Sequence, residues 1–258
     1  MSWASRRKAS YITGVMLFFA VVLGVPLAYL YFSTPPSCHD GIQNQGETAI
    51  DKGGPCLALD PNTLQPHALL WARAFKVRDG MYNAVAYVEN PNKDAGVPAA
   101  RYKFSLYDSQ NALIAEQTGT TFIMPGGITP IFASRIDTGN RVVVHTYFEL
   151  QTPLDWERMS DTAASISIDG KALSDETTAP RITANAHSAA VEDIPDASFV
   201  AVAFDANGNA IAASQPATAR FVAGSSIPLI FTWSDPFAQH VSRIDIIPVA
   251  APTAAKGL

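Results

Sequence analysis

Residues 104–116 read FSLYDSQNALIAE, and the fold expected for most of the chain follows from this pattern. Phe104 and Leu106 alternate with Ser105, which places the two apolar side chains on one face of a strand. Residues 108–111 are polar and turn the chain into a second apolar run. The stretch therefore predicts two antiparallel strands joined by a short turn.

The same period-two pattern extends on both sides of this stretch, from residue 69 to residue 150. Each apolar run is short and ends in turn-forming residues, such as Asn90-Pro91-Asn92 and Pro125-Gly126-Gly127. No long stripe with a 3.6-residue period interrupts the series. Short strands at regular intervals with turns between them predict an antiparallel β-sandwich, so the chain is expected to be mainly β.

The pattern then recurs about 97 residues later, where residues 200–213 read VAVAFDANGNAIAA and Asp205 takes the place of Asp108. Two tandem immunoglobulin-like sandwich domains are the economical interpretation, at residues 67–158 and 159–250. The bulky positions of the two copies are out of step by one residue. Ala201 and Ala203 of the second copy align with Phe104 and Leu106 of the first, and the bulky residues of the second copy are Val200, Val202 and Phe204. A one-residue slip would exchange the faces of the strand, so the buried face of the second copy is left open.

The sequence Phe104-Ser105-Leu106-Tyr107-Asp108, followed by a polar turn and an apolar strand, resembles the FxLYD domain of bacterial surface proteins. The resemblance covers roughly residues 82–150 and extends only loosely to the second copy, which lacks the leading Phe and the Tyr. It implies an extracellular immunoglobulin-like sandwich with no established enzymatic activity.

A second dominant feature is the uncharged apolar stretch from Tyr11 to Phe32. Its 22 residues at about 1.5 Å rise would form a helix of roughly 33 Å, which is enough to cross a bilayer. A cleaved signal peptide is the alternative, but the bulky residues 29–32 provide no small-x-small cleavage site. We expect an uncleaved signal anchor at residues 11–32.

Basic residues flank this span on one side only: Arg6, Arg7 and Lys8 precede it, and the next basic residue is Lys52. By the positive-inside rule, residues 1–10 form a cytoplasmic tail and the C-terminal domains are extracellular. The predicted localisation is therefore the cell membrane, crossed once.

Residues 33–66 are rich in Pro, Gly and polar residues and have no strand or helix period, so we expect an extracellular stalk. The stalk contains both cysteines of the chain, Cys38 and Cys56. Outside the cell we expect them to form a disulfide, and two free thiols are the alternative. At the other end of the chain, the small residues of 251–258 predict a flexible tail.

Oxygen-bearing side chains recur between the glycines of this stalk: Asp40, Asn44, Glu47 and Asp51. Such ligands suit calcium, although the spacing is not that of an EF-hand. The segment looks like the short C-x-D-G-I-Q-N-x-x-E-T-x-x-D-C-G-G-x-C modules found beside anchors in bacterial surface proteins, with Lys52 in place of an internal Cys. A calcium site and a turn-rich spacer without a metal are both open, and no other cofactor is expected.

The part of the chain beyond the span is acidic. Three of the 18 basic residues precede the span and all 23 acidic residues follow it, which leaves 15 basic residues and a net charge of −8 outside. Phosphate contacts need a basic surface, so a nucleic-acid partner is disfavoured.

No catalytic motif is apparent in the sequence, which lacks a G-x-S-x-G elbow and a P-loop. Asp155 and Glu157 flank Trp156, a combination that suits a carbohydrate site but more often marks a tryptophan at a domain junction. The chain is therefore expected not to be an enzyme.

The leading hypothesis is a membrane-anchored bacterial envelope protein whose domains mediate adhesion or the assembly of a surface complex. Its expected partners are the membrane and either other envelope proteins or cell-wall glycan. The alternatives are an envelope enzyme that acts on glycans and a passive structural spacer.

Overall fold

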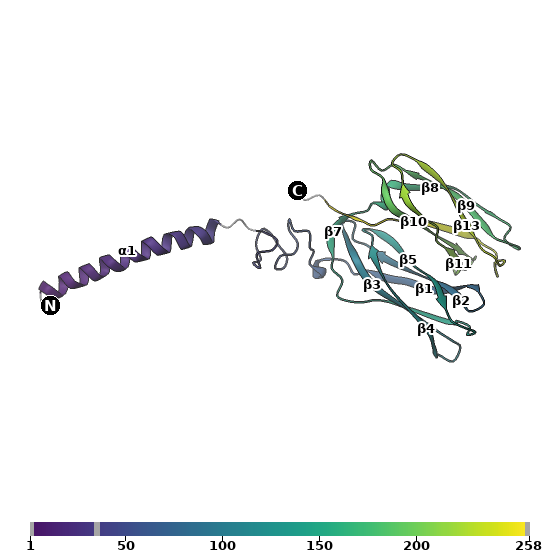
Figure 1. The fold of residues 1–258 in the computed structure, drawn as a ribbon, viewed down its shortest axis with the longest axis horizontal. Helices are drawn as coiled ribbons and strands as arrows, with labels where there is room; N and C mark the ends of the chain where they lie inside the picture. The colour runs from purple at the N-terminus through teal and green to yellow at the C-terminus, as the bar shows by residue number, and fades with distance from the viewer. Residues whose placement is uncertain (1–2, 34–36, 256–258) are drawn as a thin grey trace.

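The computed structural model describes residues 3–33 and 37–255. It contains one long N-terminal helix, a cross-linked loop and two β-sandwiches in that order along the chain (Figure 1). The predicted fold class, an apolar N-terminal helix followed by antiparallel β-sandwiches, is confirmed.

Helix α1 (Trp3–Ser33) contains the expected apolar span. Its segment Arg7–Tyr29 is long and apolar enough to cross a membrane, and a signal sequence would pass the same test. Pro26 lies inside the helix, as membrane-embedded helices tolerate. Of the expected topology residues, Arg7 and Lys8 are exposed on the first turns, whereas the side chain of Arg6 lies outside the described part of the chain.

The first sandwich consists of two antiparallel sheets. Its strands are β1 (Ala68–Arg78), β2 (Met81–Asn90), β3 (Ala95–Tyr107), β4 (Leu113–Ile123), β5 (Gly127–Asp137), β6 (His145–Leu150) and β7 (Glu157–Ser160). One sheet has the order β1-β2-β5, and the other is built on β3, which pairs with β4 on one side and with β6 and β7 on the other. The two sheets enclose a core that includes Phe104, Leu106 and Ile131.

The second sandwich follows the short 3-10 helix η2 (Ala163–Ser165). Its strands are β8 (Ile166–Ser174), β9 (Arg181–Ser188), β10 (Ile194–Phe204), β11 (Ala210–Ser214), β12 (Ala217–Phe221), β13 (Ser226–Thr232) and β14 (Arg243–Val249). One sheet has the order β8-β9-β13, and the other is built on β10, which pairs with β11 and β12 on one side and with β14 on the other.

The two sandwiches share one pairing order. Strands β8, β9 and β13 correspond to β1, β2 and β5, while β10 and β14 correspond to β3 and β6. In the second copy the partner of the central strand is divided into β11 and β12, where the first copy has the single strand β4. The internal repeat found in the sequence is therefore also a repeat of strand order.

The central strands β3 and β10 explain why the bulky residues of the two copies fall on opposite faces of the strand. Core-facing Phe104 and Leu106 of the first copy correspond to core-facing Ala201 and Ala203 of the second. The other face of β3 carries Lys103, Ser105 and Tyr107, whereas the corresponding face of β10 carries Val200, Val202 and Phe204. Strand β10 is buried on both faces. The bulky side chains of its second face therefore do not pack into the core of their own sandwich but against another part of the molecule.

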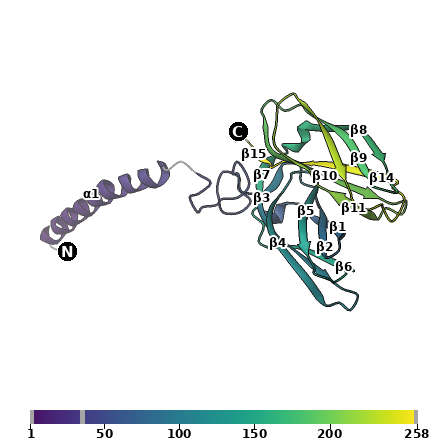
Figure 2. The same cartoon turned by 45° about the vertical axis from the view of Figure 1, so that its right-hand side comes forward.

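That part of the molecule is the first sandwich. Val200, Val202 and Phe204 pack against Phe75, Val85 and Tyr87, which point outward from the β1-β2-β5 sheet. Arg73 adds a polar contact, because its Nη1 donates to the carbonyl oxygen of Ala210 at 2.6 Å. The two sandwiches therefore share an apolar interface, and they lie against each other in both views (Figures 1 and 2).

The predicted stalk is not a free spacer over its described part. Residues 37–60 form a compact loop, and the 3-10 helix η1 (Pro61–Thr63) follows it. The backbone N–H of Leu59 donates to Trp156 O at 2.8 Å, and that of Arg158 donates to Leu57 O at 2.7 Å. Trp156 is buried and packs with Leu59 and Leu64, so this tryptophan closes the junction between the loop and the first sandwich. The sequence prediction missed this docking because the leucines that carry it lie in a Pro- and Gly-rich segment whose apolar run is too short to predict a strand or a helix.

The predicted flexible tail is also partly ordered. Its residues Thr253–Ala254 form strand β15, which pairs with Ser160 and Met159 of β7. Without β15, strand β7 would lie at the edge of its sheet, where unpaired backbone groups can accept a further strand whatever its side chains. Residues 256–258 lie outside the described residues. The chain after the second sandwich thus returns to the first.

Candidate functional site

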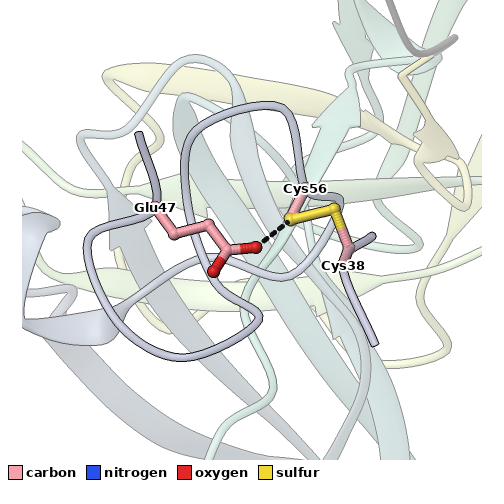
Figure 3. Close-up of side chains that lie close together, drawn as sticks. All are labelled: Cys38, Glu47 and Cys56. Carbon is pink, nitrogen blue, oxygen red and sulfur yellow. Dashed lines mark hydrogen bonds between the residues drawn. A yellow bond between two sulfur atoms is a disulfide. The ribbon is translucent and has the colours of Figure 1, made fainter. Parts of the chain in front are cut away.

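The loop after α1 is closed by a disulfide between Cys38 and Cys56, the pair expected from the sequence (Figure 3). The two Cα atoms are 5.5 Å apart, and 18 positions separate the cysteines along the chain. Cross-linking a loop of this length stabilises it by about 3 kcal/mol through the entropy of the open chain.

Glu47 lies at the centre of this loop and is only 6% exposed. Its Oε2 accepts the backbone N–H groups of Asn44 and Asp51, each at 3.2 Å. Its Oε1 lies 3.1 Å from Cys56 Sγ (Figure 3). Because a disulfide sulfur carries no hydrogen, this is a close sulfur–oxygen contact and not a hydrogen bond. The carboxylate thus fixes the backbone around the disulfide.

Asp40 and Asp51 hold the start of the loop in a similar way. The carboxylate of Asp51 accepts the N–H groups of Asp40 and Gly41, both at 3.1 Å. The carboxylate of Asp40 accepts the N–H groups of Ser37 at 3.1 Å and Ile42 at 2.8 Å, and Nδ2 of Asn44 at 2.9 Å. The bond from Ser37, followed by that from Asn44, holds the pKa of Asp40 below its usual value. These carboxylates act as local caps on turns.

The four residues predicted to bind calcium are neighbours, but they do not form a compact ligand set. Among the described residues, the group of potential ligands that lies within 4.8 Å is Glu47 with the two cysteine sulfurs, and sulfurs in a disulfide are poor ligands. The carboxylates of Asp40, Glu47 and Asp51 are not brought that close together, and each accepts backbone donors. Asn44 Oδ1 is buried and has no partner. These contacts are those of a self-capped loop, and calcium binding stays a prediction.

A second candidate site is a cleft of about 360 Å³ between the two sandwiches. The end of β1 and the start of β2 contribute Phe75, Lys76 and Asn83, and the second sandwich contributes β11 and the loop after β13. In that loop, the rings of Trp233 and Phe237 meet edge to face with centroids 5.1 Å apart. The cleft thus combines aromatic walls with polar side chains from both sandwiches.

The charged groups of the cleft have opposite signs. Lys76 Nζ lies 2.6 Å from Asp79 Oδ1, and this hydrogen bond is the main cause that raises the pKa of Lys76. Asp235, on the opposite sandwich, contributes to the same shift through its charge. The cleft therefore has no strong preference for a ligand of either sign.

This cleft was not predicted from the sequence. Lys76 and Trp233 are 157 positions apart, and only the packing of one sandwich on the other brings them together. The signal that could have indicated it is the pair Trp233 and Phe237, which are separated by Ser, Asp and Pro. Large aromatic residues are uncommon in a solvent-exposed loop, so such a pair points to a buried or ligand-binding surface.

A third group, which the sequence prediction also missed, lies on the outer sheet of the second sandwich. His187 Nδ1 is 2.5 Å from Ser226 Oγ, and its Nε2 is 3.0 Å from Asp169 Oδ2. These side chains come from three strands, β9, β13 and β8, so only the strand register brings them together. They are exposed on the sheet face, at 41% for the His187 side chain and 65% for that of Asp169.

Comparison with known proteins adds no assignment. No protein-family model matches the sequence, and no curated protein matches it. Among solved structures, the crystal structure of red sea bream transglutaminase matches with a TM-score of 0.26 and 9% sequence identity. The match covers 71% of this chain and 31% of that chain, so this chain spans about a third of that structure's length. A similarity this weak carries no argument about fold or function.

Proposed function

We propose that this chain is a single-pass membrane protein of the bacterial envelope, with its N-terminus in the cytoplasm and its two immunoglobulin-like sandwiches outside. The sandwiches mediate adhesion or the assembly of a surface complex and carry out no catalysis. This function fits the order of elements along the chain. A helix long enough to span a membrane is followed by a disulfide-linked loop that is hydrogen-bonded to β7, and then by two sandwiches that pack against each other through an apolar interface.

Two further observations support the placement outside the cell. The basic residues of the N-terminal flank lie on one side of the span, which favours a cytoplasmic N-terminus. The disulfide follows the other end of the helix, and disulfides persist in oxidising compartments. An uncleaved anchor predicts that the mature protein retains residues 1–32, which the intact mass of the purified protein tests.

The proposed assembly role is tested by photo-crosslinking in intact cells. A photoreactive amino acid placed at Val191, which is 96% exposed on the second sandwich, or at Tyr147 on the outer sheet of the first, is expected to give one defined crosslinked species. The same probe at the buried position Val202 is the control and should give only an intramolecular product. Absence of crosslinks from every exposed position would contradict the proposal and favour a passive spacer.

An envelope enzyme is the second candidate, and the Asp169–His187–Ser226 group is the observation that favours it. A serine activated by a histidine that a carboxylate orients is the arrangement used in acyl transfer. Here Ser226 faces Nδ1 and the carboxylate faces Nε2, the reverse of the usual order, and the group is exposed to water. Covalent labelling of Ser226 by a fluorophosphonate would support this candidate, and no labelling is expected under the main proposal.

A further inference from the structure

The cleft between the sandwiches has the size and the lining of a small-ligand site. Its volume of about 360 Å³ lies at the lower end of the range of about 300–1,000 Å³ typical of ligand sites, which often occur where domains meet. It is lined by the end of β1 and by β11, on the side of the two-sandwich body away from α1 (Figure 1).

The walls of the cleft are aromatic. Phe75 forms part of its floor and is 8% exposed, while Trp233 and Phe237 are half-buried. Trp233 Nε1 donates to the carbonyl oxygen of Ala213 at 3.3 Å, which holds the indole ring in place. A fixed aromatic surface that is partly open to solvent suits a ligand with an apolar face.

The rim of the cleft carries polar groups, most of them neutral. They include Asn83, Ser214, Thr232 and Ser234, together with the oppositely charged Lys76 and Asp235. This set can donate and accept hydrogen bonds at several points, and Lys76, its partner Asp79 and Asp235 together carry only one net negative charge. A neutral ligand with several hydroxyl groups matches it better than a phosphate, a carboxylate or a basic peptide.

We propose that this cleft binds a neutral saccharide, as one or two sugar rings at the end of a glycan chain. A sugar ring has an apolar face of C–H groups that packs on Trp233 and Phe237, and hydroxyl groups at its edge that reach the polar rim. The cleft is too small for a folded partner, so only a projecting terminal group enters it. This inference rests on the proposed function and names the chemistry of one of its partners.

The test uses the full-length protein in a detergent without a sugar head group, so that the detergent does not occupy the cleft. A panel of neutral monosaccharides and disaccharides, including glucose, galactose, N-acetylglucosamine and their β-1,4-linked dimers, is titrated while tryptophan fluorescence and binding heat are recorded. At least one saccharide is expected to bind saturably. Trp233→Ala and Phe237→Ala are each expected to weaken binding by about tenfold, because each removes an aromatic contact.

Two controls separate this effect from misfolding. Tyr147→Ala removes an exposed aromatic residue on the outer sheet of the first sandwich, and it should leave binding unchanged. Asp235→Ala removes an exposed rim group and is expected to fold normally while weakening binding, which keeps the proposal testable if Trp233→Ala does not fold. Thermal unfolding curves of all variants report their folding.

The proposal is overturned if no saccharide of the panel binds, if binding persists in Trp233→Ala and Asp235→Ala, or if only peptides compete for the cleft. Failure of the cleft to bind saccharide would leave the crosslinking result from Val191 and Tyr147 unaffected. The two proposals can therefore fail separately.

Discussion

At the scale of single residues, the repeat is most visible in two aspartates, each of which caps the equivalent turn of its own sandwich. Asp108 accepts the N–H groups of Gln110 and Ala112, each at 2.9 Å. Asp205 accepts those of Asn207 at 2.9 Å and Asn209 at 2.8 Å, and also Nδ2 of Asn209 at 3.0 Å. The carboxylates thus replace backbone partners that a short turn cannot supply. This role was predictable from their position alone.

The capping bonds make the stability of the second sandwich depend on pH. Hydrogen bonds from Asn209, first from its side chain and then from its backbone, lower the pKa of Asp205 from the ordinary value of 3.8. Since the folded pKa lies below the unfolded one, the stabilisation is fully present above about pH 4 and is lost as the pH falls through the folded pKa.

We therefore expect Asp205→Ala to lower the melting temperature at pH 7, with a smaller difference from the wild type near pH 3. Thermal unfolding followed by circular dichroism at the two pH values measures this. Glu192→Ala, which changes an exposed carboxylate just before β10, is the control. An effect of Asp205→Ala that is the same at both pH values would show that the charge is not the stabilising factor.

Trp156 supports a second residue-scale prediction. It is 7% exposed and joins Leu59 and Leu64 of the stalk to the core of the first sandwich. Replacing a buried Trp by Ala costs about 3–5 kcal/mol, so Trp156→Ala should strongly destabilise the protein and expose residues 57–66 to limited proteolysis. If Trp156→Ala unfolds as the wild type does and the stalk stays protected, the tryptophan does not close this junction.

At the scale of elements, the loop of residues 37–60 is held both by its disulfide and by its buried carboxylate. Replacing both cysteines by Ser removes a cross-link worth about 3 kcal/mol, which corresponds to an increase of roughly 150-fold in local opening. Amide hydrogen exchange should accelerate for Asn44, Asp51 and their neighbours, while that of β3 stays unchanged. Unchanged exchange in the loop would mean that the turn caps alone hold it.

Strand β15 gives a parallel prediction. It pairs with β7 through Thr253 and Ala254, and the N–H of Ala255 donates to Arg158 O at 3.0 Å. Removing residues 253–258 should expose the edge of β7 and speed exchange at Ser160, with a loss of stability of only about 1–3 kcal/mol for the few hydrogen bonds involved. Protection of Ser160 in the shortened protein would contradict this pairing.

The elements also show how far the sequence can predict this fold. Alternating residues and turn signals indicate most strands, because the buried face of a strand takes apolar residues at every second position of its sequence. The docking of the stalk and the pairing of β15 depend on backbone hydrogen bonds and on a few leucines in a segment too short to show a sustained period. The same holds for the Asp169–His187–Ser226 group, which the strand register assembles from three separate strands.

At the scale of the whole molecule, the two copies differ where their surroundings differ. Val85 and Tyr87 of β2 face the second sandwich, whereas Asn185 and His187 of the corresponding strand β9 face outward, with His187 exposed to solvent. Burial in this interface raises the pKa of Tyr87, whose hydroxyl has no hydrogen-bond partner among the described residues. The bulky residues of β3 and β10 therefore differ in position because the interface between the sandwiches covers the second face of β10 and has no equivalent on β3.

This interface should make the two sandwiches unfold together. Val202 is fully buried in it, and an uncompensated charge there costs about 3–5 kcal/mol. We expect the wild type to unfold in one calorimetric transition, and Val202→Asp to unfold at a lower temperature or in two steps. Val191→Asp, at an exposed position of the same sandwich, should behave as the wild type. Two separate transitions in the wild type would argue against a single body.

The proposed function requires that the sandwiches lie on the opposite side of the membrane from the N-terminus. The most direct measurement is labelling of intact cells with a membrane-impermeant amine reagent, followed by mass spectrometry of the modified lysines. The proposed topology predicts that Lys52 and Lys171 are labelled in intact cells and that Lys8 is labelled only after permeabilisation. Labelling of Lys8 in intact cells, or protection of Lys171 until the membrane is opened, would contradict it.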